Sequence, residues 1–387
     1  MTTKNKLPVF LLAAVGLLIV PLIAQQFGNA WVRIIDIALL YVLLALGLNI
    51  VVGYAGLLDL GYVAFYAVGA YMFALLASPH MTDSFPAIAA MFPEGLHFAW
   101  WFVLPLGALL AGAFGVLLGA PTLKLRGDYL AIVTLGFGEI IRVFLANLDA
   151  PVNITNGPKG LGQIDSMNLF GYDFGRKHQW FGFDVPSVTN YYYLFLFAVV
   201  IGVVVCYRLE RSRIGRAWMA IREDEIAAKA MGINTRNLKL LAFGMGATFG
   251  GVSGVLFATF QGFVSPESFS LQESVMIVAM VVLGGIGHIP GVIVGALLLA
   301  ALPEVLRYVA GPLQSMTDGR LDASILRQLL IALAMIGIML SRPRGLWPSP
   351  EHGKAVTADP TAPAPHVHLA AAEQIPPPVT HIVPTAE

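Results

Sequence analysis

Charged residues are scarce in this chain. Asp, Glu, Lys and Arg make up only 12% of its 387 residues, whereas about a quarter is usual for a soluble domain. Hydrophobic residues make up 57%. This composition excludes an ordinary water-facing globular domain and indicates a protein that lies largely in lipid. The 40 glycines agree, because small residues let helices approach closely in a bilayer.

Cysteine is almost absent, and so are the usual cofactor motifs. Cys206, the one cysteine, cannot form an internal disulfide and is interpreted as a small buried side chain in an apolar run. The histidines near the C-terminus lack the tight spacing of a metal site. The phosphate-binding motif G-x-x-x-x-G-K-[ST] is missing, so the chain is not expected to hold ATP itself. We expect no metal, no cofactor and no nucleic-acid partner for this chain.

Long apolar runs recur along the sequence. A helix needs about 20 mostly apolar residues to span a bilayer, and such runs lie near 8–25, 34–52, 60–77, 100–120, 129–147, 191–207, 239–260 and 325–341. A longer run, 273–308, is interrupted by the glycine-rich stretch 284–291, which predicts two short spans or a re-entrant pair. The pattern therefore predicts an all-α, polytopic membrane protein with about ten transmembrane passes, including broken or re-entrant helices.

Basic residues are concentrated in one loop. Eight of the 23 Lys and Arg residues fall within 208–239, and such an excess is typical of a cytoplasmic loop. An even number of passes then places both termini in the cytoplasm. We expect a membrane domain over 1–348, with this cytoplasmic loop at 208–238 and an external segment at 148–190. A disordered cytoplasmic tail, rich in Pro and Ala, is expected over 349–387.

The same loop holds the most charged stretch of the chain, IREDEIAAKAMGIN, at 221–234. As a helix it would carry a small apolar face, an i,i+4 ion pair between Glu225 and Lys229, and a stop at Gly232. The apolar face comprises Ile226, Ala227, Ala230 and Met231. Such a helix suits docking into a groove on a soluble partner, and a helix that lies on the lipid surface is the alternative.

Polar residues and glycine breaks inside the spans mark a candidate translocation pathway. A charge within a span is costly and often functional, and helices broken at glycine are typical of transporter binding sites. Close helix packing is the alternative explanation for the glycines. The candidates are Asp59, Glu139, Gly284, Gly285 and Gly287.

Seven stretches, taken in order, resemble the LivM-type permeases of branched-chain amino acid ABC importers. They are GYAGLLDLGYVAFYAVGAY (53–71), LRGDYLAIVTLGFGEIIR (125–142), TNGPKGL (155–161), GRAWMAIREDEIAAKAMGI (215–233), GFVSPESFSLQES (262–274), MVVLGGIGHIPGVIVGA (280–296) and RPRGLW (342–347). The Ala227-Ala228-x-x-x-Gly232 spacing resembles the EAA loop of ABC importer permeases, which docks on the ATPase subunit.

This resemblance implies a transport subunit, not an enzyme, in a bacterial inner membrane. The importer would take up leucine, isoleucine and valine. Its other parts would be a LivH-type second permease, two cytoplasmic ATPase subunits that bind ATP and a periplasmic amino-acid-binding protein. The chain would also contact membrane lipid. Coupling to the ATPase would involve Glu225, Ala227, Ala228 and Gly232.

Three alternatives remain open. The first is an ABC permease for another small amino acid, an amide or urea, and the second is an ion-coupled secondary carrier, which needs no ATPase. The third is an intramembrane serine protease, because the stretch 251–254 resembles the G-x-S-G of rhomboid proteases, with Ser253 as nucleophile and His288 as base.

Overall fold

The computed structural model describes residues 7–316, except 94, 123–124, 126, 170 and 181–182. Near the C-terminus it also describes 329, 332–333, 336–337, 340–341 and 345–347. The last predicted span, 325–341, lies mostly outside the described residues, and the predicted tail 349–387 lies wholly outside them. Both remain predictions.

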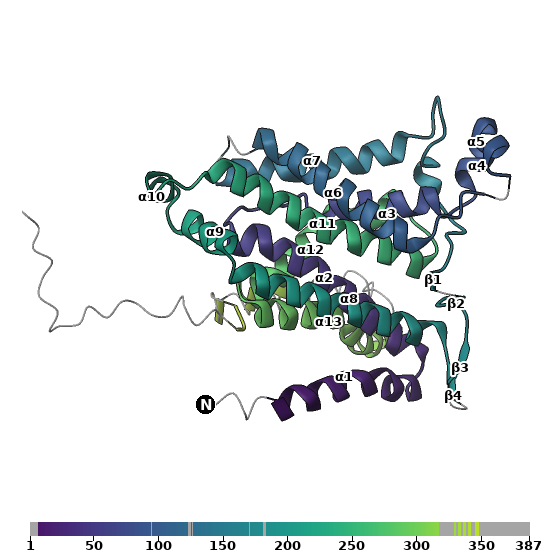
Figure 1. Ribbon diagram of the computed structural model, residues 1–387. Coiled ribbons are helices and arrows are strands. Elements are labelled where there is room, and N and C mark those ends of the chain that lie inside the picture. The colour runs from purple at the N-terminus through teal and green to yellow at the C-terminus, as the bar shows by residue number, and fades with distance from the viewer. Residues whose placement is uncertain are drawn as a thin grey trace, which may run out of the picture. The chain divides into compact units, whose positions relative to one another are not determined.

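Helices make up most of the described chain (Figure 1). In chain order they are α1 (Leu7–Gln26), α2 (Asn29–Asn49), α3 (Val63–Leu76), α4 (His80–Ser84), α5 (Pro86–Met91), α6 (Trp100–Thr122), α7 (Asp128–Asn147), α8 (Ser187–Glu210), α9 (Arg213–Glu223), α10 (Glu225–Ala230), α11 (Thr235–Gln261), α12 (Leu271–Gly284) and α13 (Ile289–Met316). A π-helical turn, η2 (Ile50–Tyr54), extends α2, and the 3₁₀ turns η3 (Gly157–Lys159) and η4 (Pro266–Phe269) lie in connections.

The predicted apolar runs coincide with these helices. Within the described residues, five helices are long and apolar enough to cross a membrane: 29–54, 100–122, 128–147, 187–210 and 235–261. Shorter apolar helices cover 15–26, 63–76, 271–284 and 289–305. The interrupted run 273–308 forms two helices, α12 and α13, as predicted. The prediction of a mainly helical protein with several apolar spans is confirmed.

The centre of the helix bundle is formed by α2 and α11. α11 packs mainly against α6 and α3, while α2 packs against α8, α11 and α13. Glycines allow these close contacts, since a Cβ on Gly69 of α3 would overlap the Gly251 backbone of α11. In contrast, α6, α7 and α8 expose large apolar side chains, which suits contact with lipid or with a membrane-embedded partner.

The segment 148–190 departs from the all-α prediction. It contains two antiparallel hairpins, β1 (Asn168–Leu169) with β2 (Tyr172–Asp173) and β3 (His178–Trp180) with β4 (Phe183–Val185). Aromatic and β-branched residues favour such strands, and Gly171 supplies the positive φ of the first turn.

The hairpins and the helices α9 and α10 lie at opposite ends of the bundle (Figure 1). α8 begins directly after β4 and ends two residues before α9. Its 24 residues give a helix about 36 Å long, enough to cross the hydrocarbon core. The predicted external segment and the predicted cytoplasmic loop are thus separated by one membrane-spanning helix.

Candidate functional site

The helix α10 is shorter than the charged stretch at 221–234 from which it was predicted, and it begins at Glu225. Asp224 has an extended backbone, and its Oδ1 accepts hydrogen bonds from the backbone nitrogens of Ile226 (2.8 Å) and Ala227 (3.0 Å). Asp224 is thus the N-cap of α10 and separates it from α9. Aspartate is favoured there because its carboxylate satisfies free N–H groups at the helix start.

The predicted stop at Gly232 is confirmed. Gly232 has φ 83°, and its nitrogen donates to the Lys229 carbonyl at 3.0 Å, while the Ile233 nitrogen donates to the Ala228 carbonyl at 3.1 Å. These two bonds form a Schellman motif, in which a left-handed residue ends the helix. Asn234 then caps α11 by accepting from the Asn237 nitrogen, as is common for asparagine.

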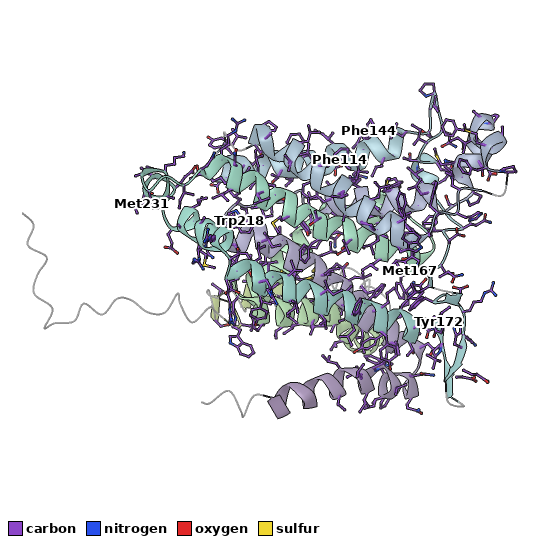
Figure 2. All side chains as sticks on the ribbon, viewed as in Figure 1. Phe114, Phe144, Met167, Tyr172, Trp218 and Met231 are labelled. Atoms are coloured by element: carbon purple, nitrogen blue, oxygen red, sulfur yellow. The ribbon has the colours of Figure 1, made fainter. Side chains whose placement is uncertain are left out.

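One face of α10 is apolar and exposed. Ile226 is 74% exposed and Met231, just after the helix, is 82% exposed, and Ala227 and Ala230 between them are exposed as well. Figure 2 shows Met231 at the outer tip of the α9–α10 region, while Trp218 lies inward. The predicted apolar face therefore exists. Exposed apolar side chains at a water-facing end indicate an interaction surface.

Ala228 and Glu225 lie on the inner side of α10, where they contact the rest of the chain. Ala228 is only 4% exposed and belongs to the hydrophobic core. The Glu225 carboxylate binds Lys239 Nζ at 2.7 Å, Lys229 Nζ at 3.1 Å and Thr235 Oγ1 at 3.2 Å. Glu225 thereby fastens α10 to α11. The expectation that Glu225 and Ala228 take part in coupling to an ATPase stays a prediction.

The charge on Glu225 is strongly stabilised. The hydrogen bond from Lys239 is the main cause, and the Lys229 ammonium adds to it, so that the pKa of Glu225 falls to about 2. The carboxylate is therefore ionised at any physiological pH. The ion pairs that hold α10 do not switch in the physiological range.

The helix α9 lies within the predicted cytoplasmic loop and anchors this region. Trp218 is fully buried, and its indole Nε1 donates to the Leu238 carbonyl of α11 at 2.7 Å. Ser212 caps the start of α9 by accepting from the Gly215 nitrogen. Because α9 and α10 are each bonded to the first turns of α11, the three helices form one unit.

The first helix break follows α2. The π-helical turn η2 ends at Tyr54, and residues 55–62 are irregular until α3 begins. The Leu60 nitrogen donates to Thr134 Oγ1 of α7 at 3.0 Å, and the Leu60 carbonyl accepts from Ser274 Oγ of α12. Irregular backbone inside a membrane protein needs such partners. The break is thus clamped between α7 and α12.

Asp59 lies within this break and is 1% exposed. Its Oδ1 accepts from the Gly61 nitrogen at 2.9 Å, whereas Oδ2 has no hydrogen-bond partner among the residues that the structure describes. It borders a small hollow together with Thr134, Phe137 and Phe243. A buried carboxylate oxygen without a partner is costly. Asp59 therefore remains a candidate pathway residue.

The second break separates α12 from α13. Gly284 packs against Gly291, since a Cβ on Gly284 would overlap the Gly291 carbonyl, so close packing explains that glycine. A segment near the C-terminus completes the backbone hydrogen bonds: the Leu346 nitrogen donates to the Leu283 carbonyl at 2.8 Å and the Trp347 nitrogen to the Gly284 carbonyl at 3.1 Å.

The two breaks meet, and the α9–α10 region reaches them. Asn49 Oδ1 accepts from the Gly287 nitrogen at 2.9 Å, and Arg222 Nη1 donates to the Gly53 carbonyl. Sequence reasoning did not single out Asn49 or assign this role to Arg222. The one available signal is that Asn49 is a polar residue at the end of an apolar run, four positions before Gly53.

Glu139 stands apart from the breaks. It pairs with Arg142 one turn later on α7, with Arg142 Nε 3.0 Å from Glu139 Oε2. Both side chains are partly exposed, beside the exposed Ile140 and Phe144. A charged pair on an apolar helix surface favours a protein or water-lined environment over lipid.

The arrangement does not support a protease. Ser253 is fully buried, and its hydroxyl donates to the Phe249 carbonyl of its own helix at 2.8 Å. His288 Nδ1 lies 2.9 Å from the Trp347 carbonyl. The two side chains are engaged elsewhere, so they do not form the nucleophile–base pair that covalent catalysis needs.

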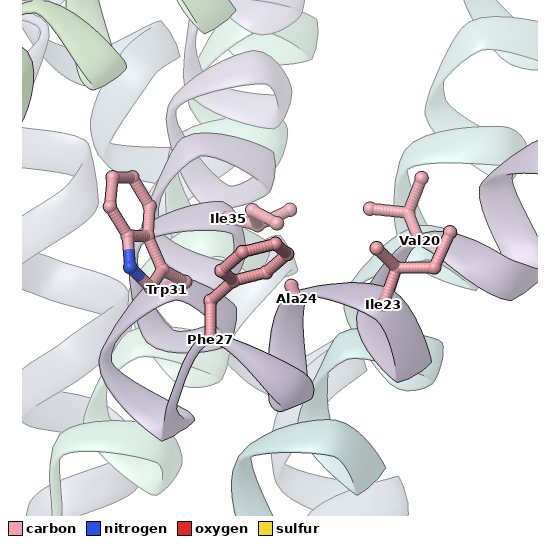
Figure 3. A pocket seen from close by; sticks show the side chains of 6 residues that line it. All are labelled: Val20, Ile23, Ala24, Phe27, Trp31 and Ile35. Atoms are coloured by element: carbon pink, nitrogen blue, oxygen red, sulfur yellow. The ribbon is translucent and has the colours of Figure 1, made fainter.

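A groove between α1 and α2 is apolar (Figure 3). The residues that line it are Val20, Ile23, Ala24, Phe27, Trp31 and Ile35. Sites for charged small molecules need a few convergent polar groups. This groove, which has no charged side chain in its lining, is not a candidate site for an amino acid.

Comparisons with known proteins agree with the architecture. The chain is 43% identical over 361 residues to the high-affinity branched-chain amino acid transport system permease protein LivM of Escherichia coli K12, covering 90% of this chain and 76% of that protein. LivM of Salmonella typhimurium gives the same identity and coverage. LivH of Salmonella typhimurium is 26% identical over 314 residues, covering 80% of this chain and 92% of LivH. No solved structure matches.

The family model described as "Branched-chain amino acid transport system / permease component" matches residues 31–339. That range includes both helix breaks and the loop that carries α9 and α10. The chain therefore belongs to the family of permease components of branched-chain amino acid transport systems.

Proposed function

We propose that this chain is one of two permease subunits of an ATP-binding-cassette importer that takes up leucine, isoleucine and valine. The names of its relatives support this substrate class, since LivM and LivH are both permease proteins of a branched-chain amino acid transport system. The second permease would be LivH-type, and a periplasmic binding protein would deliver the amino acid at the end that carries the β hairpins.

The exposed apolar face of α10 is the observation that carries the coupling role. Ile226 is exposed on a short helix and Met231 directly follows it, while Glu225 of the same helix fixes it to α11 through Lys239. A rigid helix with two large apolar side chains fits a groove on a soluble partner. The partner is an ATPase subunit, which would bind and hydrolyse ATP on behalf of a chain that is not itself an enzyme.

The membrane arrangement that fits this role has ten passes in a bacterial inner membrane. The described residues contain five helices long and apolar enough to cross a membrane and four shorter apolar helices; these would give nine passes, and the predicted span at 325–341 would be the tenth. Both termini and α10 would then lie in the cytoplasm, in keeping with the basic residues of 208–239. The hairpins of 148–190 would face the periplasm.

The translocation pathway would run along α7. Glu139 and Arg142 place charge on the outer surface of this helix. On its inner side, Thr134 Oγ1 accepts from the nitrogen of Leu60, the residue next to Asp59 in the 55–62 break. A LivH-type partner that covers α7 would bury the charged pair at the subunit interface. Such an interface is the usual place for polar groups that line a path through a membrane protein.

Reconstitution in proteoliposomes tests this function. The chain alone should not concentrate leucine, because it lacks an energy source. The chain with its second permease, two ATPases and binding protein should do so when ATP is present. Concentrative uptake by the chain alone, driven by an ion gradient, would instead establish a secondary carrier.

A further inference from the structure

Arg222 lies between α10, the proposed coupling helix, and both helix breaks. It lies in the last turn of α9, two residues before the Asp224 cap of α10. Its guanidinium Nη1 donates to the Gly53 carbonyl. This carbonyl lies in η2, at the C-terminal end of the second span, where a helix carries partial negative charge and favours a cation.

Glycines from both breaks leave the space that the Arg222 side chain fills. A Cβ on Gly56 would lie 2.8 Å from Arg222 Cγ, and a Cβ on Gly287 would lie 2.9 Å from Arg222 Nη1. Any larger residue at either position would displace the side chain. Arg222 therefore contacts the first break through its aliphatic part and the second through its guanidinium.

The segments around Arg222 are connected rigidly on both sides. On the coupling side, Trp218 ties α9 to α11, and Glu225 ties α10 to Lys239. On the membrane side, Asn49 joins the two breaks through the Gly287 nitrogen. A displacement of α10 by a bound partner would carry the end of α9, and the charged hydrogen bond of Arg222 would pull on the Gly53 carbonyl.

We propose that Arg222 is the positioning residue that transmits movement of the coupling helix to the two broken helices of the transport path. This inference rests on the proposed docking of an ATPase on α10. Arg222 itself touches neither the ATPase nor the amino acid. Its role is to make the two breaks move together with α10.

The assembled importer in proteoliposomes, with leucine as the transported probe, provides the test. In Arg222→Gln, the ATPase subunits should co-purify at the normal level and still hydrolyse ATP. Leucine uptake per ATP hydrolysed should fall by about tenfold or more, the effect expected for loss of one charge-assisted hydrogen bond. Arg213→Gln is the matched control, since Arg213 is an exposed arginine of the same helix, and it should leave the ratio unchanged.

Two further variants keep the test decisive if the Arg222→Gln chain fails to fold. Arg222→Lys retains the charge without the planar guanidinium and should give an intermediate uptake-to-ATP ratio. Gly287→Ala crowds Nη1 from the second break and should also lower the ratio. The double variant Arg222→Gln/Gly287→Ala should have nearly the same uptake-to-ATP ratio as Arg222→Gln alone, because both changes remove the same contact.

Two results would overturn the inference. A normal uptake-to-ATP ratio in Arg222→Gln would show that the residue transmits nothing, and loss of ATPase binding would make it a docking contact. The uptake-to-ATP ratio is measured on complexes that contain both ATPase subunits, so it does not depend on whether the exposed face of α10 is the docking site. Variants of Met231 test that separate claim.

Discussion

Asn49 Oδ1 accepts a hydrogen bond from the Gly287 nitrogen at 2.9 Å, across 238 positions of the sequence. The bond joins the end of α2 to the loop between α12 and α13. Asn49 is fully buried, so no water can easily replace it. The two glycine breaks are therefore parts of one structure, which neither stretch of sequence reveals alone.

Replacing Asn49 by leucine should destabilise the protein. The Gly287 nitrogen would lose its acceptor in a buried place, which costs about 1–3 kcal/mol. The free energy of unfolding in mixed micelles measures this loss. Asn147→Leu is the control, because Asn147 is exposed and its side chain donates to the Val143 carbonyl of its own helix. Equal stabilities of the two variants would show that the bond between the breaks contributes nothing.

Substitutions at Gly232 should separate backbone conformation from size. A Cβ there meets no atom within 4 Å, but φ is 83°. Gly232→Val should cost about 1–2 kcal/mol through the left-handed backbone and weaken ATPase binding by misdirecting the end of α10. Gly232→Asn should be tolerated, because asparagine adopts this conformation more readily. Co-purification of the ATPase with each variant is the measurement, and equal losses for both would contradict the argument.

Glu225 should give a specific pH dependence. Its folded pKa of about 2 lies below the ordinary value of 4.5, so its ion pairs stabilise the fold fully above pH 4.5. This stability is lost as the pH falls from 4.5 toward 2. Thermal unfolding of the native protein and of Glu225→Gln should differ by a constant amount from pH 8 to 5, and the difference should shrink below that. A difference that changes between pH 6 and 8 would refute the assignment.

The orientation can be tested by cysteine labelling after Cys206→Ser. Arg213→Cys in α9 should react with an impermeant thiol reagent only from the cytoplasmic side. Gln179→Cys in β3 should react only from the periplasmic side. Both positions are exposed in the structure. Labelling of position 213 from the periplasm would reverse the proposed topology.

The spans could be predicted because lipid imposes a simple rule: an apolar run of sufficient length forms a helix. The stop at Gly232 and the apolar face of α10 were also predictable, since both follow from local pattern. The hairpins of 148–190 were missed because two- and three-residue strands leave too short a pattern to read.

The tertiary contacts of the site could not be predicted. Ala228 and Ala227 are adjacent alanines, yet one is buried and the other exposed, which depends on how α10 packs against the rest of the chain. Glu225 could pair with Lys229 by spacing alone, but its shorter contact with Lys239 depends on how α10 folds back. Arg222 looked like one charge among several until the fold placed three distant glycines around it.

Binding of the ATPase subunit to Met231 variants tests the central claim most directly. Met231→Asp should weaken ATPase binding by at least about thirtyfold, because a charge would replace an apolar side chain at the centre of the contact. Met91→Asp is the matched control: Met91 is a similarly exposed methionine, 78% against 82%, on α5, which lies away from α10 in Figure 1. The account predicts normal binding for Met91→Asp and loss for Met231→Asp, and undiminished binding by Met231→Asp would contradict it.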